Sequence, residues 1–152
     1  MKGGDSNGFK KNNGDTFSAI VLCTSLVTTS SETTYPPADD GIAPTYEIAG
    51  NPKSNLSVSG KTAYCTSETV GDNAVSITVE QTLEKYNGWF WIWNDVKDAH
   101  WTETVNENTI WMSNTKGSLS NGTYRLKSVF TLTNSSGKTE TITIYSAEKK
   151  VG

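Results

Sequence analysis

An alternation of apolar and polar residues dominates the chain after Asn55 and restricts it to β-strands. Its clearest stretch is AVSITVEQTLEK, residues 74–85, where Gln81 interrupts an apolar row. That row consists of Val75, Ile77, Val79 and Leu83. A period of two places alternate side chains on opposite faces of a strand, and no window of useful length shows the 3.6-residue period of a helix. We therefore expect an all-β protein, with Gln81 near a sheet edge or a bulge.

Turn-forming residues divide this alternation into about seven to eight short strands. They lie at 70–73, 86–89 and 135–138, and the strands follow one another at intervals of roughly 8 to 14 residues. Within the second turn, Asn87-Gly88 is suited to a tight two-residue hairpin loop. This spacing is typical of a β-sandwich or a β-barrel.

Two aromatic positions favour an immunoglobulin-like antiparallel β-sandwich. Tyr124 stands at the start of a late strand, directly after a turn, which is the place of the tyrosine corner in such folds. A strand rich in tryptophan lies about 35 residues earlier, where these folds carry their core tryptophan. The disulfide of the immunoglobulin pattern is missing, because Cys23 falls in a segment that we expect to be removed. We expect Cys65 to be buried in a strand; the alternatives are a reactive thiol or an intermolecular bridge.

The first part of the chain has the order of a secretory signal. Three lysines in the first eleven residues precede an apolar run from Phe17 to Val27, and small polar residues follow. We predict a signal peptide or leader over 1–31, and hence a secreted, extracellular protein. The alternative is an ordinary first strand, IVLCTSLV. All four prolines lie within 32–54, which reads as a Pro/Thr-rich linker, and the sandwich domain is expected over 55–152.

A cluster of tryptophans is the strongest candidate for a binding site. The stretch WFWIWNDV, residues 89–96, is apolar on both faces if it forms a strand, so we expect a central strand with an aromatic face. The candidate ligand-binding residues are Trp89, Trp91, Trp93, Trp101 and Trp111. Such rings stack on sugars or anchor proteins, so the expected partner is a glycan, a cell-wall polymer or a protein. The alternative is a structural or self-associating domain whose tryptophans are core or pack against a second copy.

Catalytic and metal chemistry find little support in the sequence. His100 is the only histidine, and its neighbours Asp95 and Asp98 belong to a stretch, 94–100, that reads as a loop. No serine stands in a nucleophile-elbow pattern, and a zinc site needs more histidine and cysteine ligands than the chain offers. We therefore expect no enzyme activity, no metal and no cofactor.

The charge pattern argues against binding to nucleic acid, and the length of the apolar runs argues against insertion into a membrane. The net charge is -3 and the basic residues are scattered, which disfavours nucleic-acid binding. No apolar run reaches the length that spans a bilayer, so we expect no stable membrane insertion after cleavage of the signal.

An ordered set of short motifs resembles a known group. The motifs are LEK (83–85), GW (88–89), GTYRLKSVFT (122–131) and TETITIYS (139–146). Together they resemble small secreted proteins of Gram-positive bacteria that carry only a domain-of-unknown-function label, over residues 55 to about 147. The resemblance implies a signal peptide and a β-sandwich, and it implies no catalytic residues. The high tryptophan content of 89–93 departs from the pattern.

Overall fold

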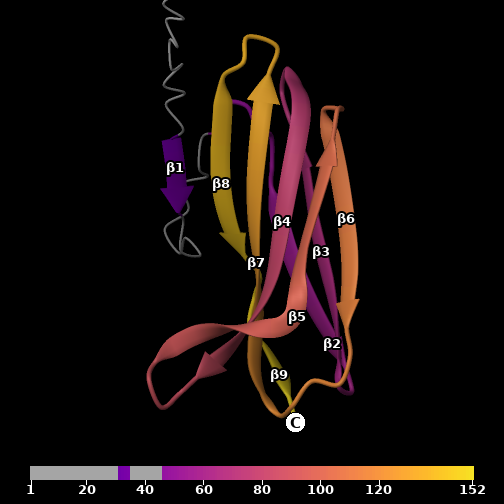
Figure 1. Ribbon diagram of the computed structural model, residues 1–152, viewed down its shortest axis with the longest axis vertical. Coiled ribbons are helices and arrows are strands. Elements are labelled where there is room, and N and C mark those ends of the chain that lie inside the picture. The colour runs from indigo at the N-terminus through magenta and orange to yellow at the C-terminus, as the bar shows by residue number, and fades with distance from the viewer. Residues whose placement is uncertain (1–30, 35–45) are drawn as a thin grey trace, which may run out of the picture.

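The computed structural model describes residues 31–34 and 46–152, which contain strands and no helix (Figure 1). These residues form nine strands. In chain order the strands are β1 (Ser31–Thr34), β2 (Lys53–Ser59), β3 (Thr62–Val70), β4 (Ala74–Asn87), β5 (Ile92–Val105), β6 (Thr109–Lys116), β7 (Gly122–Asn134), β8 (Thr139–Tyr145) and β9 (Lys149–Val151). The all-β prediction is confirmed.

Two sheets pack face to face. The smaller has the order β2-β3-β6, and the larger has the order β1-β8-β7-β4-β5, with β9 beside β7. All pairs are antiparallel except β1 with β8. Taking β2 to β8 as seven strands, the first, second and fifth form one sheet, and the third, sixth and seventh lie in the other. This is the immunoglobulin arrangement with the fourth strand, β5, moved to the opposite sheet, so the predicted sandwich is confirmed.

The expected tyrosine corner is present where the chain enters β7. Tyr124 is almost fully buried, and its hydroxyl donates a hydrogen bond to the carbonyl oxygen of Ser120 at 2.7 Å. This bond fixes the connection between β6 and β7 on the end of the sandwich.

The core follows the alternation, with one exception. On β7 the inward row of the alternating pattern is buried, and it consists of Tyr124, Leu126, Phe130 and Leu132. On β4, Ile77, Val79 and Leu83 are buried as predicted, whereas Val75 is 47% exposed. The prediction for Val75 was wrong because the pairing of β4 with β7 shifts between Ala74 and Ser76, and this bulge turns the side chain outward.

A buried polar layer divides the core into two apolar clusters. At its centre, Gln81 is fully buried and donates from Nε2 to Ser67 Oγ at 2.7 Å. Its Oε1 accepts from Asn114 Nδ2 at 3.0 Å, and Ser67 is linked to Ser128. Gln81 therefore lies in the interior of a central strand rather than at an edge, although a bulge does follow it. Because every group in the layer has a partner, it fixes the register of the two sheets.

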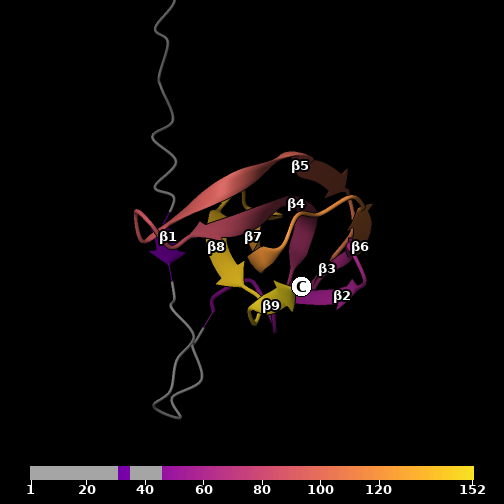
Figure 2. The ribbon, with the colours of Figure 1, turned by 90° about the horizontal axis from the view of Figure 1, so that it is seen from below.

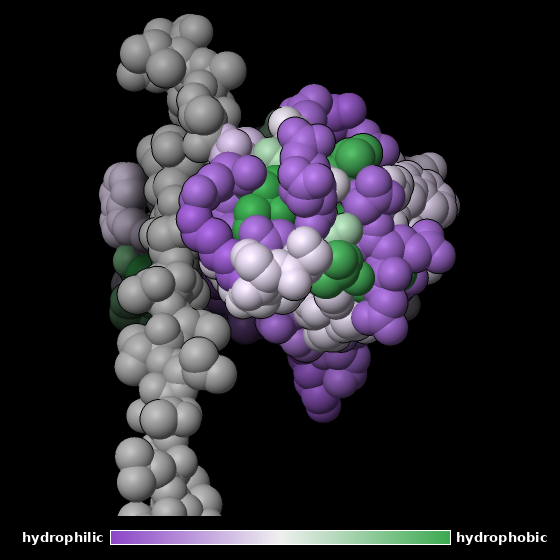
Figure 3. All heavy atoms as spheres, turned by 90° about the horizontal axis from the view of Figure 1, so that it is seen from above, coloured by the Kyte–Doolittle hydropathy of each residue, from purple (hydrophilic) through white to green (hydrophobic). Residues whose placement is uncertain are grey.

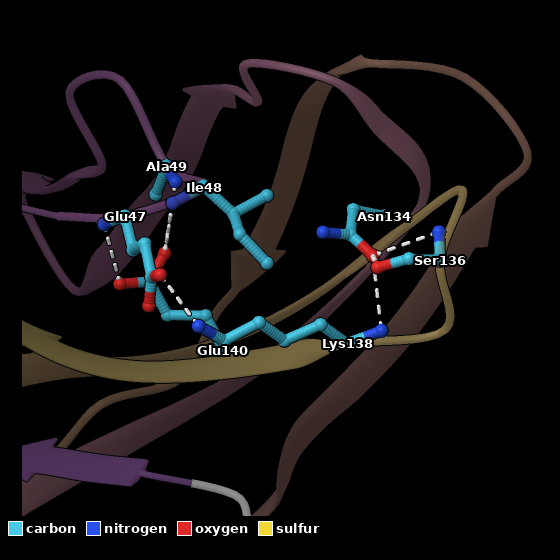
Figure 4. Close-up of polar contacts among 7 residues, drawn as sticks. All are labelled: Glu47, Ile48, Ala49, Asn134, Ser136, Lys138 and Glu140. Carbon is cyan, nitrogen blue, oxygen red and sulfur yellow. Dashed lines mark hydrogen bonds and ion pairs between the residues drawn. The ribbon is translucent and has the colours of Figure 1, made fainter.

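The domain begins earlier than predicted. Ile48 and Ala49 are buried in the core, and the Glu140 carboxylate accepts the backbone N–H groups of Glu47, Ile48 and Ala49 at 2.9, 2.8 and 2.9 Å (Figure 4). The expected boundary between 54 and 55 was therefore wrong. Proline content indicated a linker, but a single acidic side chain on β8 holds this segment against the sheet.

The predicted signal peptide falls almost entirely outside the described residues. Of 1–31 only Ser31 is described, as the first residue of β1, and the other three residues of β1 that pair with β8 belong to the predicted linker. The export prediction stays a prediction.

The strand that carries the tryptophans differs most from expectation. Residues 92–105 form one continuous strand, β5, where the sequence predicted a strand, a loop and a second strand. β5 pairs only with β4 and is an edge strand, not a central one. The predicted loop corresponds to a bulge: Glu84 pairs with Asp95 and Thr82 with His100, which leaves 96–99 opposite a single residue of β4.

Candidate functional site

The β4–β5 hairpin reaches away from the body of the sandwich (Figures 1 and 2). Its last paired residues are Asn87 and Ile92, and a turn of four residues, Gly88–Trp91, joins them. We call residues 88–92 the hairpin tip. Its exposed fractions are 85% for Trp89, 65% for Phe90, 80% for Trp91 and 48% for Ile92.

Asn87 shapes this turn. Its Oδ1 accepts the backbone N–H of Trp89 at 3.1 Å, and its carbonyl oxygen accepts the N–H of Phe90 at 3.2 Å. The predicted two-residue loop at Asn87-Gly88 was therefore wrong. Asparagine remains in the strand and acts as the cap of a wider turn, so Trp89 and Trp91 leave the strand altogether.

Trp91 adopts a backbone conformation that a bulky residue rarely takes. Its φ is 59°, in the left-handed region. This conformation costs about 1–2 kcal/mol for a residue with a side chain. The ring is almost fully exposed, so contacts within the chain do little to offset that cost. Strain of this kind, held at an exposed apolar position, is a mark of functional segments.

The other predicted site residues do not join the tip. Trp93 is half-buried, and its ring covers one face of the Arg125 guanidinium at 4.2 Å from the centroid. The Tyr145 ring also lies against this guanidinium, with its centroid at 4.1 Å, and Arg125 Nε donates to the Glu84 carboxylate at 2.6 Å. Trp93 thus braces the base of the hairpin on the outer face of the sheet.

Trp101 and Trp111 lie elsewhere again. Trp101 pairs with Gln81 on the inner face and packs against both core clusters. Trp93 and Trp101 are eight positions apart and would share a face in a regular strand, but the bulge at 96–99 places them on opposite faces. Trp111 is 63% exposed on β6 of the smaller sheet, beside a hollow of about 290 Å³.

The predicted single aromatic face is therefore not formed. The structure brings together two of the five tryptophans, Trp89 and Trp91, and adds Phe90 and Ile92, which would lie on the opposite face from them in a regular strand. A signal for this was available, because four consecutive large apolar residues directly after Asn-Gly are unusual for a turn. An exposed apolar patch of this kind marks a contact surface.

A cavity of about 500 Å³ lies beside the base of the hairpin. Its wall includes Lys85 and Gly88 from one side and Lys116 from the end of β6. Lys85 Nζ donates to Ser120 Oγ at 2.7 Å, and Asp95 contributes a carboxylate to the same wall. Polar and cationic groups thus stand next to the apolar tip.

The remaining candidate groups show no catalytic arrangement. His100 is exposed, and its Nδ1 lies 2.9 Å from Thr82 Oγ1, while neither Asp95 nor Asp98 forms a hydrogen bond with it. Over residues 46–152, no three histidine, cysteine or acidic side chains gather in a metal-binding group.

Cys65 is buried, as predicted. It is fully enclosed in the core, and burial raises the pKa of its thiol to about 12. The thiol is therefore protonated and inert at neutral pH.

In the described part of the chain, no helix has the length and apolar character needed to cross a bilayer. No protein-family model and no curated protein matches the chain. Among solved structures, the chain is similar to the CARDB domain of a Pyrococcus furiosus protein in complex with di-metal ions. The identity is 15% and the TM-score 0.31, over 74% of this chain and 100% of that one. At this level of similarity no property of that domain, its metal ions included, carries over.

Proposed function

We propose that this chain is an exported binding module that contacts its partner through the hairpin tip and acts without catalysis. The observation that carries the proposal is the tip itself: three aromatic rings and an isoleucine, all exposed, on a hairpin that projects from the sandwich. Nothing in the fold requires these residues, because the core is complete without them. The signal-like order of the first residues supports export.

The partner classes that the tryptophans indicate are a glycan, a cell-wall polymer or a protein, and the lipid of the cell envelope is a further surface that such an apolar tip can contact. A second copy of the chain is the alternative, because an apolar tip on an edge-strand hairpin also suits self-association.

The test measures binding of the purified protein to envelopes of a Gram-positive bacterium, which contain both wall polymer and membrane. The tip variant Trp89→Ser/Trp91→Gly is compared with Trp111→Ala, which removes an exposed tryptophan far from the tip. We expect the tip variant to lose binding by at least about tenfold and Trp111→Ala to bind as the parent does, because the contact surface is confined to the tip.

Equal binding by parent and tip variant would contradict the proposal. Sedimentation equilibrium over a range of protein concentrations tests the alternative, which is self-association of the chain. A dimer that the tip variant abolishes, together with no envelope binding, would establish self-association instead.

A further inference from the structure

The partner class of the hairpin tip can be narrowed further. On the premise of the proposed function, we infer that the tip inserts into the interface of an anionic lipid bilayer without spanning it, while lysines at the same end of the domain contact the headgroups. The expectation of no membrane insertion rested on the length of apolar run that spans a bilayer, and an interfacial contact needs no such run.

The chemistry of the tip matches a bilayer interface better than it matches a sugar. Residues 88–92 carry no hydroxyl, amide or carboxylate side chain. A sugar ring needs hydrogen-bonding partners around the aromatic surface on which it stacks, and the tip supplies none beyond its indole N–H groups. Tryptophan has an apolar body and one polar N–H, and it is enriched where lipid chains meet headgroups.

The shape of the tip also suits insertion into the interface of a bilayer. The tip is the convex end of a two-stranded ribbon that stands clear of the sandwich in two perpendicular views (Figures 1 and 2). Interfacial anchors bury their apolar face about 5–10 Å into the headgroup boundary. A projecting turn reaches that depth while both sheets stay in water.

The end of the domain from which the hairpin projects is rich in lysines that form no ion pair. Strand pairing places the β2–β3 turn, the end of β6 and β9 at this end. Its lysines are Lys61, Lys85, Lys97, Lys116, Lys149 and Lys150. The same end carries Asp95, Asp98 and Glu148, while Arg125 and Glu84 pair with each other, so six lysines against three acidic side chains leave an excess of three positive charges. The three ion pairs between described residues involve Lys53, Arg125 and Lys138, so none of these six has a carboxylate partner among them.

The opposite end of the domain carries a net negative charge. It holds the β7–β8 turn and is mainly hydrophilic, with small apolar patches between its loops (Figure 3). Its charged residues are Glu47, Asp72, Glu107, Lys138 and Glu140. This asymmetry favours the approach of the tip end to an anionic surface, although the chain as a whole carries a net charge of -3.

The cavity beside the hairpin provides a place for a headgroup. Two of these lysines, Lys85 and Lys116, line it together with Gly88 at the start of the tip, and their ammonium groups donate to Ser120 Oγ and to the Asp98 carbonyl oxygen. Asp95 is the one acidic side chain in its wall, so the lining is net cationic. A phosphate held there would lie next to an inserted Trp89.

The experiment uses the purified protein with two kinds of vesicle: phosphatidylcholine alone, and equal parts of phosphatidylcholine and phosphatidylglycerol. Binding is measured by co-sedimentation, and insertion by the blue shift of tryptophan emission and its quenching by lipids brominated on their acyl chains. We expect tryptophan quenching and at least about tenfold tighter binding to the anionic vesicles, because each lysine near the surface adds to the attraction.

Four variants sharpen the result. Trp89→Ser/Trp91→Gly is expected to lose the quenching and at least about tenfold in binding. Trp111→Ala is expected to retain both. Lys85→Gln/Lys116→Gln is expected to keep the quenching and to lose part of the preference for anionic lipid. Phe90→Ser provides a second tip change in case the double variant does not fold.

The outcomes separate this inference from the proposed function. No binding to either vesicle, with tip-dependent binding to lipid-free wall sacculi, overturns the lipid inference and leaves the binding module standing. Tip-dependent binding that protease treatment of the envelopes abolishes points to a protein partner and also overturns it. Vesicle binding that the tip variants do not change means that the lysines act alone, which overturns it as well. If the tip variants bind envelopes as well as the parent does, or if the parent does not bind envelopes at all, both proposals are overturned.

Discussion

The β4–β5 and β7–β8 hairpins begin their turns with the same device. In each, an asparagine side-chain oxygen accepts the N–H two residues on, and the asparagine carbonyl oxygen accepts the N–H three residues on. The residues are Asn87 in the first turn and Asn134 in the second, and Figure 4 shows the contacts of Asn134. Each turn then uses one residue with positive φ.

The residues that fill the two turns differ. The β7–β8 turn continues with serine, serine, glycine and lysine, and its positive φ of 81° falls on Gly137. The β4–β5 turn places Trp91 at a φ of 59°, with Trp89 and Phe90 exposed before it. The residues of the β7–β8 turn suit the backbone conformation of that turn. The β4–β5 turn has a similar backbone but carries side chains that do not stabilise the fold, which is the pattern expected of a contact surface.

The largest expected effect contrasts one phenylalanine from each hairpin. Phe130 is fully buried on β7, whereas Phe90 is 65% exposed in the tip. We expect Phe130→Ala to lower the free energy of unfolding by about 3–5 kcal/mol, because it leaves a cavity in the core. Phe90→Ala should change it by less than about 0.5 kcal/mol. Urea denaturation of both variants measures this. A large loss for Phe90→Ala would show that the tip packs on the domain.

A smaller effect is expected from the two capping asparagines. Asn134 Oδ1 accepts from Ser136 N, Ser136 Oγ and Lys138 N, whereas Asn87 Oδ1 accepts one backbone N–H. We expect Asn134→Ala to lower the free energy of unfolding by about 1–2 kcal/mol and Asn87→Ala by about 0.5 kcal/mol. Thermal unfolding compares them. Equal losses would mean that the two turns depend on their caps alike, and the contrast drawn above would fail.

The smallest effect tests the strained tryptophan. Trp91→Gly is expected to raise the free energy of unfolding by about 0.5–1 kcal/mol, because glycine adopts positive φ without steric conflict. Gly137→Ala in the other turn is expected to lower it by a similar amount. Chemical denaturation of both variants shows whether each substitution raises or lowers the free energy of unfolding. A destabilised Trp91→Gly would show that the indole makes contacts that support the fold.

Much of the fold could be predicted from local pattern. The inner rows of β4 and β7, the burial of Cys65 and the hydrogen-bonded Tyr124 all follow from a period of two and the position of turns. Val75 and the start of the domain could not, since one depends on a bulge against β7 and the other on the reach of Glu140 from β8.

The candidate site was predicted in composition but not in geometry. Tryptophan content drew attention to the β4–β5 hairpin, and two of the named residues, Trp89 and Trp91, belong to its exposed tip. Trp93 does not belong to the tip because its ring packs against Arg125, and Trp101 does not because the four-residue bulge places its ring on the inner face.

Alternation, turn residues and the apolar tryptophan run determined on their own that the chain is all-β, with the strand spacing of a sandwich or barrel and with surplus aromatic residues, because these signals are local and repeat along each strand. Only the tertiary structure decided which aromatic residues face solvent. The width of a turn and the length of a bulge are set by the neighbouring strands, and a shift of one residue moves every following side chain to the other face.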